Sequence, residues 1–191
     1  MKNESRFLSP AQLLALLKAA REHSVRSWAM ILLAYRHAMR ASEVCNLNLS
    51  DVNLKTGTLH IARLKGSLES VQPLEKLKGQ PLLDERKALT LWLAERDDNS
   101  PFLFTSQKGG RIDRTQFFRI LKTCAERAGV PKISPHTLKH TRCSLALQGG
   151  ATIAEVQRLA GHTAMKSTTW YLHATDEQAA KAARKAEANL F

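Results

Sequence analysis

Hydrophobic residues in the N-terminal part of the chain recur every three to four positions, which is the repeat of an amphipathic helix. Ser9 and Pro10 precede the first of these runs, and a serine followed by proline is a typical helix start. We therefore predict a helix over residues 10–23 and a second, largely buried helix over 24–39. A short amphipathic turn over 41–47 follows.

A period-two alternation of apolar and polar residues replaces the helical repeat in the next part of the chain. Residues 58–64 alternate in this way, which is typical of a half-buried strand. Gly66 and Ser67 can form a turn, and residues 68–74 can return as the partner strand. The sequence therefore predicts an antiparallel β-hairpin.

The helical repeat returns after the hairpin and continues to the end of the chain. A short apolar strand or extended piece at 102–104 interrupts it, and glycines punctuate several of its helix ends. We predict a mostly α-helical fold with one small antiparallel β-sheet, an α+β protein. Residues 1–175 would form the main domain and 176–191 a C-terminal helix. The helices predicted after the hairpin are 84–95, 113–128, 136–149, 152–159 and 176–189.

The charge of the chain narrows its possible partners. Its 29 Lys and Arg residues outnumber 17 Asp and Glu residues, giving +12, which predicts a polyanionic partner such as nucleic acid or an anionic membrane surface. The longest apolar stretch, residues 28–35, is much shorter than the roughly 20 residues that a spanning helix needs. The polar residues 1–6 also lack the apolar segment of a secretory signal. We expect a cytoplasmic protein with no membrane segment.

Much of the positive charge lies in one stretch of the sequence. Residues 107–142 contain nine Lys or Arg but only two acidic residues, which favours binding to a phosphate backbone. Aromatic residues make up only 6% of the chain, so duplex DNA is a better fit than a single strand stacked on aromatic rings. The candidate DNA-binding residues are Lys108, Arg111, Arg114, Arg119, Lys122 and Arg142.

The chain has two tyrosines, and they stand in different surroundings. Tyr35 lies within the apolar stretch of the second helix and is predicted to be a core residue. Tyr171 follows His162 by nine residues, in a segment rich in small polar residues. A phenol held in line with a phosphodiester among cationic groups can form a covalent phosphoenzyme. Tyr171 is therefore a candidate nucleophile.

Three boxes of sequence, in order, resemble the tyrosine recombinases (phage integrase family). The first is Tyr-Arg-His-Ala-Met-Arg-Ala-Ser-Glu-Val, in which Arg40 matches the family's first catalytic arginine. Lys65 matches its hairpin lysine. The second box is His-Thr-Leu-Lys-His-Thr from His136, and the third is Leu-Ala-Gly-His, followed by Tyr171. The resemblance covers residues 7–174 and implies the catalytic-domain fold of that family.

Within the family, the sequence is most similar to the short recombinases that invert promoter segments for fimbrial phase variation. These also lack a large N-terminal DNA-binding domain. The resemblance implies a homotetramer on two duplex DNA sites, with reliance on synapsis or on an accessory DNA-bending or core-binding protein. The helix 176–191 would dock on a neighbouring protomer or pack within its own chain.

The resemblance also implies a role for each catalytic candidate. Tyr171 would attack the phosphodiester to leave a 3′-phosphotyrosyl link, and Lys65 would protonate the departing 5′ oxygen. His136 would accept the phenol proton or orient the phosphate. Protein cations replace any metal, and no cofactor is implied. The groups that would stabilise charge on the phosphoryl oxygens are Arg40, Lys139 and His162.

One position departs from the family pattern. Lys139 stands where the second catalytic arginine is expected, and a lysine offers a point charge in place of a two-pronged donor. Loss of such a donor would cost about 10²–10³ in rate. Arg142, three residues further along the same helix, is a candidate to compensate.

Two further functions stay open on the sequence. The first is a catalytically weakened DNA-binding protein that occupies recombination sites and regulates a full enzyme. Footprinting without cleavage would favour it. The second is a relaxing topoisomerase of related mechanism, which would act as a monomer on arbitrary sequence.

Overall fold

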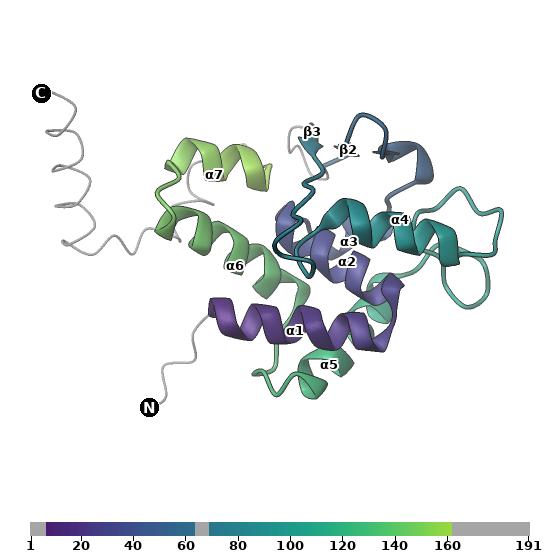
Figure 1. The fold of residues 1–191 in the computed structure, drawn as a ribbon, viewed down its shortest axis with the longest axis horizontal. Helices are drawn as coiled ribbons and strands as arrows, with labels where there is room; N and C mark the ends of the chain where they lie inside the picture. Colours follow the sequence, from purple (N-terminus) through teal and green to yellow (C-terminus); the bar gives the residue numbers. More distant parts are fainter. Residues whose placement is uncertain (1–6, 64–68, 162–191) are drawn as a thin grey trace, which may run out of the picture.

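A computed structural model describes residues 7–63 and 69–161 of the chain (Figure 1). The helices predicted within these ranges are confirmed, and the turn predicted at 41–47 contains a short helix of its own. The helix predicted at 176–189 lies outside the described residues. The helices are α1 (Pro10–His23), α2 (Val25–Arg36), α3 (Ala41–Cys45), α4 (Glu85–Glu95), α5 (Arg114–Arg127), α6 (Pro135–Gln148) and α7 (Ile153–Ala160).

Side-chain caps explain where several helices begin. Ser9 Oγ accepts from the Gln12 N–H at 3.2 Å, and the Gln12 side chain accepts from the Ser9 N–H at 2.9 Å. This reciprocal pair satisfies two amide groups that the first turn leaves without helical partners. Pro10 follows at the first helical position, as predicted.

The second helix ends three residues earlier than the sequence pattern predicted, at Arg36. Ala38 has a φ of 48°, in the left-handed region that a helix cannot accommodate. The chain turns there, and the Met39 N–H bonds back to the Ala34 carbonyl at 3.0 Å. The apolar character of Ala38 and Met39 reflects burial in this turn and not continuation of the helix.

The predicted hairpin is confirmed, and it belongs to a three-stranded antiparallel sheet in the order β1-β2-β3. Leu59 pairs with Gln72, and both predicted strands are shorter than the sequence suggested. The connection at 64–68 lies outside the described residues. Phe102 forms an isolated bridge with Asn48 and not a strand. The strands are β1 (Val52–Asn53), β2 (Thr58–Ile61) and β3 (Ser70–Pro73), and a 3₁₀ turn, η1 (Leu49–Asp51), precedes them.

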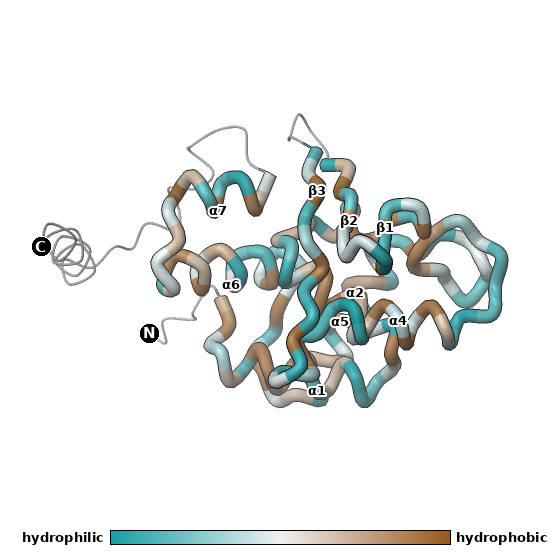
Figure 2. Tube along the Cα trace, turned by 45° about the horizontal axis from the view of Figure 1, so that its top comes forward, coloured by the Kyte–Doolittle hydropathy of each residue, from teal (hydrophilic) through white to brown (hydrophobic). Residues whose placement is uncertain are grey.

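The centre of the molecule is α2, which is almost entirely apolar and buried from Trp28 to Tyr35. It packs against α1, α4 and α6. The tube in Figure 2 alternates between hydrophobic and hydrophilic residues along α1, as expected for a helix with one face in the core. Within the described ranges, no helix combines the length and apolar character needed to cross a bilayer.

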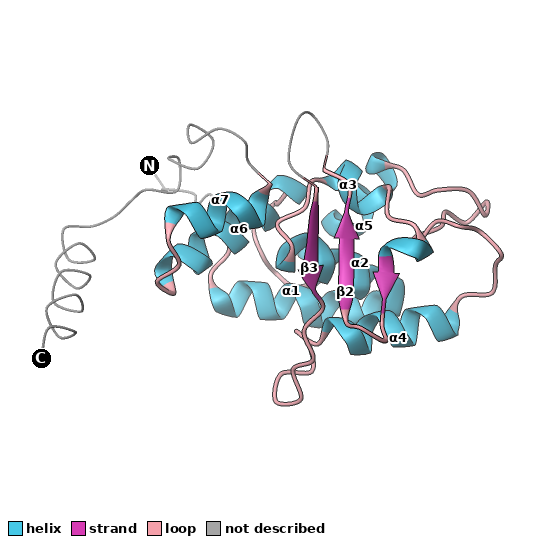
Figure 3. Cartoon of the chain, turned by 90° about the horizontal axis from the view of Figure 1, so that it is seen from above, coloured by secondary structure: helices cyan, strands magenta, loops and turns pink. Residues whose placement is uncertain are grey.

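A second, smaller apolar cluster joins α6 and α7 to the turn after α2. It consists of Ala38, Cys143, Val156 and Ala160, all buried. Figure 3 shows the strands side by side, with α6 and α7 beside β3. This packing brings the end of α7, the turn after α2 and the hairpin into one neighbourhood, although they are far apart in sequence.

Candidate active site

Arg40 lies at the start of α3, immediately after the turn that ends the central helix. Its Nη1 donates to Glu43 Oε1 at 2.7 Å, and its backbone N–H donates to Glu43 Oε2 at 2.8 Å. Glu43 is buried, whereas the side chain of Arg40 is 32% exposed. The Glu43 carboxylate thus fixes Arg40 while leaving part of the guanidinium accessible.

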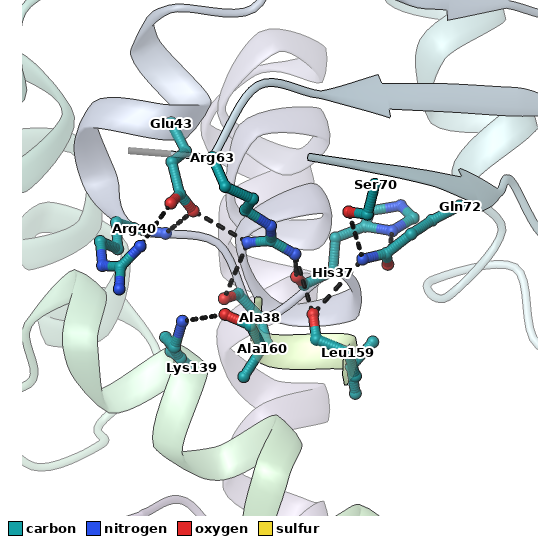
Figure 4. A network of polar contacts seen from close by, with 10 residues as sticks. All are labelled: His37, Ala38, Arg40, Glu43, Arg63, Ser70, Gln72, Lys139, Leu159 and Ala160. Carbon is teal, nitrogen blue, oxygen red and sulfur yellow. Dashed lines mark hydrogen bonds and ion pairs between the residues drawn. The ribbon is translucent and has the colours of Figure 1, made fainter. Parts of the chain in front are cut away.

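Arg63 is a buried cation at this site that the sequence analysis missed. Its Nη1 donates to Glu43 Oε2 at 2.9 Å, and its Nη2 donates to the carbonyls of His37 at 2.9 Å and Leu159 at 2.8 Å. Figure 4 shows the guanidinium between Glu43 and the end of α7. Strand alternation contained a signal for it. Residues 59, 61 and 63 share one face, and since Leu59 and Ile61 are core residues, an arginine two positions on must find buried partners.

Lys139 approaches the same neighbourhood from α6. Its Nζ donates to the Ala160 carbonyl at 2.7 Å, and the residue is only 1% exposed. Burial and then the charge of Arg40 lower the pKa of Lys139 to about 8. The lysine amine is thus held against the last turn of α7, below Arg40 in the view of Figure 4.

The charged cluster at this site contains one carboxylate, Glu43, and three cations, Arg40, Arg63 and Lys139. Its net charge is therefore +2. Burial alone would raise the pKa of Glu43. The Arg40 amide and the Arg63 charge outweigh it and hold that pKa below its ordinary value, which keeps the carboxylate ionised. A surplus of cations in a poorly solvated site attracts an anion strongly.

An open hollow of about 660 Å³ lies in front of Arg40. His136 stands at its rim on the first turn of α6, after the capping Ser134. Partial burial, then the charges of Lys139 and Arg40, lower the pKa of His136, which keeps its imidazole neutral near pH 7. The His140 ring packs edge-on against it, 4.3 Å between centroids. The lining residues are Arg40, Ala41, Ser42, Arg114, Thr115, Phe118, Ser134, Pro135 and His136.

Five of the six candidate DNA-binding residues occupy three kinds of place. Arg114 lines the hollow, and Arg119 and Lys122 are exposed on α5. Lys108 is exposed on the preceding loop, where Arg111 donates to Asn46 Oδ1 at 2.9 Å.

Arg142 is the one candidate directed towards the central helix. Its Nε donates to the Arg36 carbonyl at 3.1 Å, and its guanidinium lies 5.9 Å from the centroid of the Tyr35 ring. Arg142 is not among the residues that line the hollow. Tyr35 is buried, as predicted for a core residue.

The structure thus brings the first and second sequence boxes together. Arg40 and His136 line one hollow, and Lys139 is buried and not among the lining residues. The other three catalytic candidates, Lys65, His162 and Tyr171, lie outside the described residues. Gly161 of the third box is described, and it directly follows the two carbonyls that Arg63 and Lys139 bind.

The described part of the chain combines a helical domain and a three-stranded sheet with a hollow that is lined by Arg40 and His136. The chain belongs to the phage integrase family, the tyrosine recombinases, since that family matches residues 6–178. It is accordingly an enzyme of DNA recombination, and the resemblance predicted from the sequence boxes is confirmed.

Particular relatives sharpen this assignment. The chain is 35% identical to the type 1 fimbriae regulatory protein FimB of Escherichia coli strain K12, over 90% of this chain and 88% of FimB. It is 34% identical to tyrosine recombinase XerC of Corynebacterium glutamicum, over 86% of this chain but only 52% of XerC. The crystal structure of XerA recombinase superposes with a TM-score of 0.78 at 26% identity, covering 94% of this chain and 64% of XerA. The predicted fold class is confirmed.

Proposed function

We propose that this protein is a site-specific recombinase that cuts and rejoins duplex DNA in the cytoplasm, one strand at a time, through a 3′-phosphotyrosyl link to Tyr171. The observation that carries the proposal is that Arg40 of the first sequence box and His136 of the second line the same hollow. Arg40 reaches it from the turn after α2, fixed by the buried Glu43, and His136 reaches it from the start of α6. Such a site offers cationic and imidazole groups to a single phosphate.

The charge surplus suits the chemistry of this reaction. Attack by the Tyr171 oxygen places negative charge on the non-bridging phosphoryl oxygens, and donors fixed in advance stabilise that charge without having to reorganise. Arg40 is the partly exposed donor of the cluster, and the buried Lys139 is close enough for its charge to add to that of Arg40. Lys65 protonates the leaving 5′ oxygen. The phosphotyrosyl bond keeps the energy of the broken bond, so a 5′ hydroxyl can reverse the step without ATP.

His136 suits the role of proton acceptor or phosphate-orienting group. Its lowered pKa leaves the imidazole neutral at the pH of the cytoplasm, and only a neutral imidazole can take the proton of the phenol. Its place on the first turn of α6 adds the positive end of that helix to the field at the phosphate.

The biological event that we propose is DNA inversion by a homotetramer on two sites. FimB, which matches over most of both chains, is a fimbriae regulatory protein. Residues 107–142 carry +7 of the net charge of +12, so most of the attraction for DNA comes from this one stretch. Binding to one isolated site should therefore be weak. Synapsis, docking by the helix 176–191, and an accessory DNA-bending or core-binding protein would supply the rest.

A suicide substrate tests the reaction. A duplex carrying the recombination site and a nick beside the cleavage position traps the covalent intermediate, because the short fragment with the free 5′ hydroxyl diffuses away. We expect a protein–DNA adduct, stable to denaturation, that peptide mapping locates at Tyr171 and that Tyr171→Phe abolishes. Binding of the duplex without any adduct would refute the cleavage mechanism.

A second candidate is a DNA-binding regulator with weakened catalysis. The observation that favours it is the burial of Lys139, whose amine is bound to the Ala160 carbonyl and so is engaged inside the protein. This function predicts a footprint on the site with little cleavage. It also predicts that Lys139→Arg restores cleavage, because a guanidinium can bind the carbonyl and a phosphate oxygen together.

A further inference from the structure

The Arg63 guanidinium joins three segments that lie far apart in the sequence. One amino group holds the carboxylate of Glu43 in α3, and the other holds the carbonyl of His37, in the turn after α2. The second group also holds the carbonyl of Leu159 near the end of α7, 96 residues away. The side chain is fully buried. Arg63 is not among the residues that line the hollow, so it acts on DNA there through its charge and through the groups it binds, not by direct contact.

On this geometry, and resting on the function proposed above, we propose that Arg63 is a positioning residue for strand cleavage. It fixes the Arg40 guanidinium through their shared partner Glu43, and it fixes the end of α7 relative to Arg40. The planar fork of an arginine supports this role, because it can direct bonds to a carboxylate and to two carbonyls at once.

The last turn of α7 receives cations from two other elements. Arg63 binds the Leu159 carbonyl from the hairpin, and Lys139 binds the next carbonyl, Ala160, from α6. Gln72 of β3 adds a third donor, its Nε2 lying 3.3 Å from the Leu159 oxygen. Positive groups at the carboxyl end of a helix interact favourably with the negative end of its dipole, and they also satisfy its free carbonyls.

Gly161 shows how closely Arg63 packs on the third box. Its φ is +65°, and a β-carbon at this position would meet Cδ and Nε of Arg63 at 3.0 Å. The residue that precedes His162 in the chain therefore rests on the Arg63 side chain. A change in the position of the Arg63 side chain would therefore disturb its contacts with Gly161, which precedes His162, and with Glu43, which binds Arg40.

Replacement of Arg63 by lysine tests the proposal. The variant Arg63→Lys keeps the positive charge but offers one ammonium group, which cannot span three acceptors. The matched control is Arg26→Lys. Arg26 is partly buried, and its Nη1 donates to the backbone carbonyl of Thr105 at 2.7 Å, away from the cluster. Both variants are compared with the unaltered chain in single-turnover cleavage of the nicked suicide duplex, in DNA affinity and in thermal unfolding.

We expect Arg63→Lys to cleave at least tenfold and up to about 100-fold more slowly at saturating DNA, the cost of displacing catalytic groups by about 1 Å. Its Kd for DNA should stay within about threefold, since the exposed cations that bind phosphates are unchanged. Arg26→Lys should leave both values unchanged. This split between rate and affinity, measured where both variants are fully folded, is not produced by a merely structural role.

A double-mutant cycle gives a second measure that does not depend on the stability of one variant. If Arg63 acts in part through Glu43, then Arg63→Lys combined with Glu43→Gln should lose less rate than the product of the two single losses predicts. Additive losses of rate would overturn the proposed route through Glu43.

The outcomes separate this inference from the function on which it rests. If the unaltered chain forms no covalent adduct with DNA that it binds, the proposed recombinase function fails and takes the inference with it. If the unaltered chain forms the adduct and Arg63→Lys, fully folded, forms it at the same rate, the function stands and the positioning role of Arg63 is refuted. A loss of affinity that accounts for the whole loss of rate refutes it as well.

Discussion

The surroundings of Lys139 make its charge depend on pH in a range where an arginine would stay charged. Burial and the neighbouring Arg40 lower its pKa to about 8, so the free enzyme loses this positive charge as the pH rises through that value. The protonated form is present below it. Because the charge contributes to the field at the phosphate, its protonation state bears directly on the rate.

We predict that kcat/KM for DNA cleavage falls as the pH rises through about 8, since this ratio reports on groups in the free enzyme. In Lys139→Arg the fall should disappear or move to higher pH, because a guanidinium stays protonated throughout the neutral and alkaline range of the measurement. Cleavage rates at subsaturating DNA, from neutral to alkaline pH, measure this. An identical alkaline limb in both proteins would assign it to another group.

The buried carboxylate of Glu43 gives a prediction about stability. Its removal in Glu43→Ala leaves the Arg63 guanidinium buried without its charged partner, which should lower the free energy of unfolding by about 3–5 kcal/mol. Glu126, exposed on α5 and 3.8 Å from Lys122, is the control, and Glu126→Ala should cost about 0–1 kcal/mol. Urea denaturation of both variants measures the difference, and equal losses would contradict the buried pairing.

At the scale of elements, the two helix ends at Gly129 and Gly161 form a natural comparison. Both glycines have a φ near +60°, so alanine is strained at either by about 1–2 kcal/mol. At Gly129 a β-carbon meets nothing within 4 Å, whereas at Gly161 it meets Arg63.

We predict that Gly161→Ala lowers the free energy of unfolding by more than Gly129→Ala does, and that it alone slows cleavage of the suicide duplex. The first effect follows from the contact with Arg63 and the second from the proximity of the end of α7 to the catalytic cluster. Denaturation curves and single-turnover rates for the two variants provide the measurement. Equal effects would mean that the contact with Arg63 has no role.

The elements themselves could largely be predicted from the sequence, because their signals are local. The Ser9 cap, the helical repeats and the alternation at 58–64 each act over a few residues. The early end of α2 could not be predicted, because alanine rarely adopts the left-handed conformation that Ala38 has here. The strand β1 was not predicted, because two residues are too few to show an alternation of apolar and polar positions.

The site was predictable only in part, for a related reason. Arg40, His136 and Lys139 are marked by motifs with characteristic neighbours. Arg63 owes its place to partners at Glu43 and Leu159, and no local pattern reveals contacts between residues so distant in the chain. Alternation along the strand placed it on the buried face, but only the packed molecule shows what it binds there.

At the scale of the whole molecule, net charge governs the encounter with DNA. The stretch 107–142 supplies exposed cations on α5 and the loop before it. We predict that Arg119→Gln and Lys122→Gln each weaken DNA binding for all sequences alike and reduce the slope of log Kd against log salt by about 1. Lys87→Gln, an exposed change on α4, should leave the slope unaltered. Titrations at several salt concentrations measure this, and unchanged slopes for all three would place the DNA on another face.

The grip of Arg63 and Gln72 on the end of α7 has a consequence for protein engineering. A chimera that takes its C-terminal part from one recombinase and its hairpin from another would separate donors from the carbonyls they hold. Such grafts should cleave DNA more slowly even when every catalytic side chain is present. The hairpin and the C-terminal part should therefore be taken from the same recombinase, so that these hydrogen bonds are kept.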